Sequence, residues 1–191
     1  QGNPGYTGTA TAPDMGADET NSGQAVFCSG TPATSVINGA GSVCTGSGTT
    51  LTSSSGEYGI TYAWFSGITP GGPYPTALGT APTQVTGNLT VPAYYICITT
   101  CASSGLSFTT PEKSVMINAL PTVVVNPASS SYCSPGGTAV ALTAGGANAY
   151  AWSPATGLSA TTGATVSASP ASSTIYTVTG TDANGCVNTA T

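Results

Sequence analysis

The tripeptide Tyr-Ala-Trp occurs twice in this chain, at residues 62–64 and 150–152, and these copies contain its only two tryptophans. A cysteine lies about 20 residues before each copy, and a tyrosine-containing segment follows each one. The order cysteine, tryptophan, tyrosine thus recurs after 88 residues. This period is too long for a solenoid repeat and matches small domains in tandem. It predicts two domains, at residues 25–119 and 120–191.

The composition predicts that both domains are all-β. Charged residues make up only 4% of the chain, whereas hydrophobic residues make up 39%. Most of the remainder is threonine, serine and glycine, which suit the solvent faces of strands and the turns between them. Strong helix formers such as lysine, arginine and glutamate are nearly absent, so helices are disfavoured.

The few charges exclude several classes of function. Lys113 is the only cation, and the chain has no histidine and no arginine. A basic surface for nucleic acid therefore cannot form, and a net charge of −5 indicates only weak acidity. No apolar run approaches the roughly 20 residues of a membrane span, so we expect no membrane insertion.

Residues 1–24 show no sustained periodicity and are rich in glycine, threonine and proline. Two interpretations remain open: a linker, or the tail of an upstream domain such as a β-helix, whose endings the segment 13–19 resembles. Asp14, Asp18 and Glu19 lie close together and are weak candidate ligands for calcium, the one cofactor that we consider. Otherwise we expect no cofactor.

Short strand-like segments separated by Gly-Pro-rich turns fill both domains. Tyr62 and Trp64 alternate on one strand, and Tyr95 stands two residues before Cys97. Together these features predict two immunoglobulin-like β-sandwiches placed end to end, joined by a short junction that Pro121 stiffens. The expected core aromatic residues are Trp64, Tyr95, Trp152 and Tyr176.

Two segments carry a resemblance to known families. Residues 28–101 resemble immunoglobulin-like repeats of very large secreted and surface proteins of Bacteroidota, and residues 150–186 resemble another repeat common in those proteins. The resemblance implies an extracellular spacer in a cell-surface adhesin or gliding-motility filament exported by the type IX secretion system. Its implied partners are neighbouring domains of the same chain, the secretion or surface-anchoring machinery, and surface glycans or proteins.

Six cysteines without zinc-knuckle spacing predict disulfides and an oxidising compartment. Cys97 occupies the inter-sheet position of the sandwich, and Cys44 begins the strand expected to face it. This predicts the bridges Cys44–Cys97 and Cys28–Cys101. Cys133 and Cys186 are then the remaining cysteines, and the third predicted bridge joins them. The last pair conflicts with the topology, which places these two cysteines at opposite ends of the domain.

No catalytic chemistry is expected, because nucleophilic catalysis usually needs histidine as a base and the carboxylates of the two domains are scattered. The turn at residues 182–185 could offer two oxygens to calcium, although its role as a hairpin turn already explains it. Two alternatives to the spacer remain. Loops around Tyr58, Tyr74 and Leu158 could bind a glycan or a protein, or the chain could be the non-catalytic C-terminal part of a secreted hydrolase.

The closing strand of the second domain is expected to be incomplete, since it begins only after Cys186. We therefore expect unpaired backbone groups along residues 176–179, a labile second domain, and a native chain that continues beyond Thr191.

Overall fold

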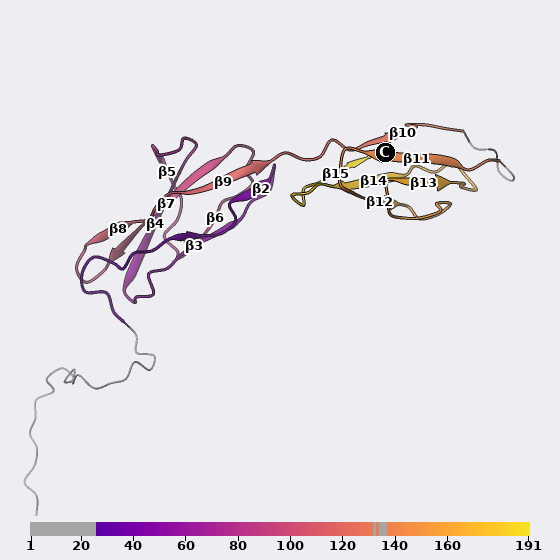
Figure 1. Cartoon of the computed structure of the whole chain (residues 1–191). Coiled ribbons are helices and arrows are strands. Elements are labelled where there is room, and N and C mark those ends of the chain that lie inside the picture. Colours follow the sequence, from indigo (N-terminus) through magenta and orange to yellow (C-terminus); the bar gives the residue numbers. More distant parts are fainter. Residues whose placement is uncertain (1–25, 132, 134–136) are drawn as a thin grey trace, which may run out of the picture.

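The computed structural model describes residues 26–131, 133 and 137–191 (Figure 1). In this part of the chain every regular element is a β-strand. The expected segment 1–24, with Asp14, Asp18 and Glu19, lies outside the described residues.

The first domain consists of two sheets. One sheet has the strand order β1-β3-β6, and the other has the order β2-β9-β7-β4-β5, with β8 beside β7. The strands of the first sheet are β1 (Ile37–Asn38), β3 (Thr50–Ser53) and β6 (Thr83–Val85). Those of the second sheet are β2 (Ser42–Cys44), β4 (Ile60–Gly67), β5 (Thr76–Ala77), β7 (Ala93–Cys101), β8 (Ser107–Thr109) and β9 (Lys113–Asn118).

The pairing of β4 with β7 is the longest ladder of the molecule and places Trp64 directly opposite Cys97. Trp64 is buried, and its indole N–H donates to the Ala81 carbonyl at 2.8 Å. A buried indole needs such a partner, because an unpaired N–H in an apolar core is costly. The core around it includes Leu51, Tyr95 and Val115, so both sheets contribute.

The second domain repeats this arrangement with fewer strands. One sheet contains β10 (Val124–Asn126), β11 (Val140–Gly145) and β13 (Thr165–Ala168), in that order. The other contains β12 (Ala149–Ser153), β14 (Thr177–Thr181) and β15 (Val187–Ala190), in that order. Trp152 is buried here too, and its indole donates to the Gly163 carbonyl at 2.9 Å. Tyr176 is half-buried at the edge of this core.

The order of the strands identifies the fold. In the second domain the first, second and fourth strands form one sheet, and the third, fifth and sixth form the other. In the first domain the corresponding strands are β1, β3 and β6 on one side and β4, β7 and β9 on the other. This partition is that of the immunoglobulin-like sandwich, with β5 as an added strand beside β4. The molecule is therefore a tandem of two such domains, which follow one another along its length (Figure 1).

A closing strand of four residues, β15, is present in the second domain, which corrects the expectation of an unpaired edge for residues 178 and 179 but not for 176 and 177. Strand β15 pairs with β14 from Val187 to Ala190, opposite Thr181 to Val178. Val178 and Thr179, expected to be unpaired on this side, are thus part of the ladder.

Candidate functional site

A disulfide joins the two domains. Cys44, the last residue of β2, is bonded to Cys186, in the turn between β14 and β15, with their Cα atoms 5.5 Å apart. The two residues are separated by 142 positions in the sequence, and Cys186 is fully buried. The expected bridges Cys44–Cys97 and Cys133–Cys186 are both wrong.

Sheet topology explains why Cys44 does not bond to Cys97. Strands β2 and β7 belong to the same sheet, with β9 between them, so Cys44 cannot face Cys97 across the sandwich. The residue that faces Cys97 across the sandwich is Ser53 on β3, which is buried beside the Cys97 thiol. Cys97 is a free, buried cysteine, and burial raises the pKa of its thiol. Serine thus occupies the position where an inter-sheet bridge would need cysteine.

Cys133 is free and exposed in the connection between β10 and β11. That connection leaves β10 at Asn126, at the end of the domain remote from the turn that carries Cys186. The conflict noted from the sequence was therefore real, and the structure resolves it by giving Cys186 a partner in the other domain.

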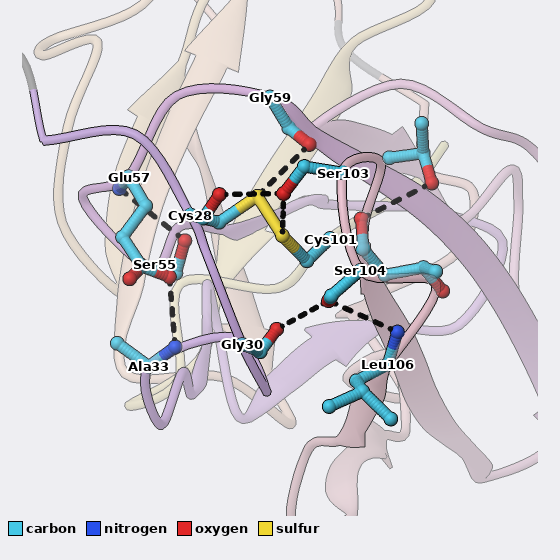
Figure 2. Close-up of a disulfide and its surroundings, with 12 residues drawn as sticks. Cys28, Gly30, Ala33, Ser55, Glu57, Gly59, Cys101, Ser103, Ser104 and Leu106 are labelled. Atoms are coloured by element: carbon cyan, nitrogen blue, oxygen red, sulfur yellow. Dashed lines mark hydrogen bonds between the residues drawn. A yellow bond between two sulfur atoms is a disulfide. The ribbon is translucent and has the colours of Figure 1, made fainter.

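A second disulfide joins Cys28 to Cys101, the pairing expected from the sequence (Figure 2). Cys101 is fully buried at the end of β7, and the Cys28 amide donates to the Tyr58 carbonyl at 3.0 Å. Ser103 donates its hydroxyl to the Cys28 carbonyl, and Ser104 donates to the Gly30 carbonyl at 2.7 Å. These bonds hold the N-terminal strap of the first domain, defined as residues 28–44, against the turn after β7.

Hydrogen bonds surround the junction between the domains. The Thr45 amide and hydroxyl both donate to the Asn118 carbonyl, at 2.9 and 3.2 Å. On the side of the second domain, the Asn188 side-chain amide donates to the Pro121 carbonyl at 3.0 Å. The start of the junction is therefore held by Thr45, the residue that follows the strap, and its middle by Asn188 of β15.

The turn that presents Cys186 is organised by Asp182. One carboxylate oxygen of Asp182 accepts from the amides of Asn184 and Cys186, each at 2.8 Å. Gly185 has a φ of 79°, whereas no described non-glycine residue has a positive φ. The expected Asn-Gly turn thus uses the left-handed conformation at its glycine alone. Oδ1 of Asp182, in the turn that could offer oxygens to calcium, thus accepts from two backbone amides.

The structure does not bring together the side chains expected to bind a ligand. Tyr58 precedes β4 and its ring packs at a tilt against that of Phe27, with ring centroids 5.7 Å apart. Tyr74 follows the other end of β4, where its hydroxyl donates to Glu112. Leu158 packs against the core of the second domain. The three residues therefore form no common binding surface.

Glu112 anchors the loop that contains Tyr74. In addition to the Tyr74 hydroxyl, its carboxylate accepts from the Gly71 amide at 2.8 Å. The hydrogen bond to Glu112 raises the pKa of Tyr74. Tyr74 is half-buried, so local packing accounts for its position.

A cavity of about 500 Å³ opens at the end of the second domain remote from the junction. Its walls include the core residues Leu142, Trp152 and Tyr176 and serine-rich loops. Among the described residues, no three metal-ligating side chains lie close enough together to hold a metal ion. In the same part of the chain no helix is long and apolar enough to cross a membrane.

Comparisons with solved structures find distant structural neighbours of this chain. No family model matches the chain, and no curated protein matches it. The chain is similar to three N-terminal domains of the highly immunogenic outer capsid protein Hoc of bacteriophage RB49, with 18% identity, a TM-score of 0.44 and coverage of 82% of this chain. It spans 57% of that structure. It is also similar to fibronectin(III)-like modules of CbhA from Clostridium thermocellum, with 10% identity, a TM-score of 0.41, and coverage of 82% of this chain and 90% of that one.

Proposed function

We propose that this chain is a structural spacer in a large extracellular bacterial surface adhesin or filament, of the kind that Bacteroidota export through type IX secretion. The observation that carries the proposal is the covalent link between consecutive sandwiches, Cys44–Cys186. A spacer must hold its domains in a defined order and orientation. The disulfide contributes to this because it fixes one point of the first domain to one point of the second. The bonds of Thr45 and Asn188 support the same junction from both sides.

The two disulfides support an extracellular location, because such bonds persist in oxidising compartments. The surface chemistry fits the same setting. With 4% charged residues and abundant hydroxyl groups, the chain offers few sites for strong electrostatic contacts with a partner. The specific link to Bacteroidota and to type IX secretion is supported by the sequence resemblance of residues 28–101 and 150–186.

The spacer function is tested by replacing residues 25–191 within the full-length protein, displayed on the bacterium that produces it. Residues 25–191 are exchanged for an unrelated pair of immunoglobulin-like domains of the same length, and in a second strain they are deleted. We expect the exchange to preserve surface display and adhesion, and the deletion to reduce adhesion, because a spacer contributes length rather than contacts. Loss of adhesion in the exchanged strain, with surface display intact, would instead identify a binding module.

The isolated chain offers an independent measurement. We expect small-angle X-ray scattering to give a radius of gyration well above the ~16 Å of a compact globule of this length. A value near 16 Å would contradict the spacer proposal. A glycan array probed with the same protein should show no specific binding, and a reproducible hit would contradict it as well.

A further inference from the structure

We propose that the Cys44–Cys186 bridge transmits an applied force directly from Cys44 to Cys186. Pulling on the two ends of the chain then cannot extend residues 45–185. The biological meaning of this inference rests on the proposed spacer function. Its physical basis is the covalent connectivity alone. Residues 45–185, which include nearly all of both cores, lie inside the loop that the bridge closes.

The covalent path along the chain shows the size of the effect. Without disulfides, 158 peptide units connect Cys28 to Cys186, which could extend to ~570 Å at about 3.6 Å per residue. With the bridge, the path follows 16 units from Cys28 to Cys44 and then crosses directly to Cys186. Its limit is then ~60 Å, whatever happens to the folded domains.

The strap that carries this load is held at both ends. At its start, Cys28 is bonded to the buried Cys101, and the bonds of Ser103 and Ser104 hold the backbone beside it (Figure 2). At its end, β2 pairs with β9 in parallel, from Ser42 opposite Met116 to Cys44 opposite Asn118. The strap is therefore part of the folded first domain.

The junction lies inside the closed loop as well. Residues 119–123, the connection between the last strand of the first domain and the first strand of the second, are bypassed by the bridge. Tension is therefore transferred from the end of β2 to the turn before β15 without loading this connection. Among the strands of the second domain, β15 alone follows Cys186 and so lies outside the loop.

Single-molecule force spectroscopy of the whole chain tests the proposal. Handles are attached through peptide tags at the two termini, without cysteine chemistry, and the final contour length is compared between variants under oxidising conditions. Residues outside the two bridges contribute equally to every variant, so that differences report on the loops alone. A variant that folds poorly remains informative, because the final contour length depends only on which residues are covalently joined.

The proposal predicts a different contour length for each pair of removed cysteines. In C44S/C186S the shortest path runs through Cys28–Cys101 and then along 85 peptide units, which adds ~250 Å to the contour length of the parent. C28S/C101S should keep the contour length of the parent, because its shortest path is unchanged. Removal of all four cysteines should add ~510 Å. The matched control C133S, which changes an exposed free cysteine, should also extend like the parent.

A parent protein that extends as far as C44S/C186S would overturn the proposal, and so would a C28S/C101S variant that extends further than the parent. Neither outcome would affect the replacement experiment, which measures adhesion by the full-length protein. Conversely, a failure of the replacement experiment would leave the measured contour lengths unchanged, so the two proposals can fail separately.

Discussion

At the scale of single residues, the first domain contains one half of an inter-sheet bridge. Cys97 lies on β7 opposite Trp64, as the fold requires, but its neighbour on β3 is Ser53. Both side chains are buried, so the thiol is shielded from oxidants and from other cysteines. The immunoglobulin-like core is thus stabilised here by packing around Trp64 without the disulfide that often accompanies it.

We predict that S53C forms a third disulfide, with Cys97. The bridge would close a loop between the two sheets and stabilise the oxidised protein by about 2–4 kcal/mol in the chain-entropy model. Denaturant unfolding of the oxidised variant measures this change, and alkylation after unfolding should no longer label Cys97. S53A is the matched control and should change the free energy of unfolding by less than about 1 kcal/mol. An S53C protein that retains a free Cys97 thiol would show that the two side chains do not meet.

Tyr74 should titrate above the ordinary tyrosine pKa of 10.0 because its hydroxyl donates to Glu112. The folded state holds this proton more tightly, so the contribution of the bond to stability is complete below pH 10 and is lost as the pH rises through the raised pKa. NMR titration of ring-labelled tyrosines should show E112A lowering the pKa of Tyr74. Tyr176, whose pKa is raised by burial, provides the internal control and should not change. An unchanged pKa for Tyr74 in E112A would refute the assignment.

At the scale of elements, the turn between β14 and β15 positions one of the two cysteines that connect the domains. Asp182 closes this turn with two backbone bonds, and Gly185 supplies the left-handed conformation. Because the Cys186 amide donates one of those two bonds, the geometry of the disulfide depends on a carboxylate four residues earlier. The hairpin and the bridge therefore form one structural unit.

We predict that D182A destabilises the second domain by about 1 kcal/mol, because two amides lose their common acceptor on a half-exposed turn. Hydrogen exchange should show faster exchange of the Asn184 and Cys186 amides. N184A is the matched control: only the backbone amide of Asn184 bonds to Asp182, so the variant should retain normal stability. Equal destabilisation by both substitutions would contradict this role of Asp182.

At the scale of the whole molecule, the two disulfide loops overlap in sequence. The first runs from Cys28 to Cys101 and the second from Cys44 to Cys186, so the first domain participates in both. Reduction of Cys44–Cys186 would release a loop of 142 residues and connect the domains only through the junction and its hydrogen bonds. The disulfide is therefore the one covalent link between the domains besides the peptide junction itself.

We predict two free thiols per chain with different accessibility. Alkylation of the native protein should label Cys133 alone, whereas alkylation after unfolding should also label Cys97. Peptide mapping without reduction should recover a cross-linked pair of peptides that contain Cys44 and Cys186. A peptide pair joining Cys133 to Cys186 would instead restore the pairing expected from the sequence and remove the link between the domains.

The sequence by itself determined the class and the number of domains. The repeated Tyr-Ala-Trp motif predicts tandem sandwiches because a central strand needs a large buried side chain, and Trp64 and Trp152 both fill that place. Local composition also predicts strands and turns, since β-propensity and glycine conformations act within a few residues. The pairing of Cys28 with Cys101 was predicted together with Cys44–Cys97 from the expected sandwich, and only the first of these two bridges is present.

Only the tertiary structure decided that Cys44 bonds to Cys186 and that Cys97 remains free. Disulfide formation requires Cα atoms within about 7 Å, a condition on distances in space that spacing in the sequence does not encode. Cys44 lies in the same sheet as Cys97 and near the start of the second domain, and both facts depend on the parallel pairing of β2 with β9. The one signal in the sequence was the placement of Cys133 and Cys186 at opposite ends of a domain. It showed that their pairing was doubtful but could not identify Cys44 as the partner, because the contact between domains exists only in the folded chain.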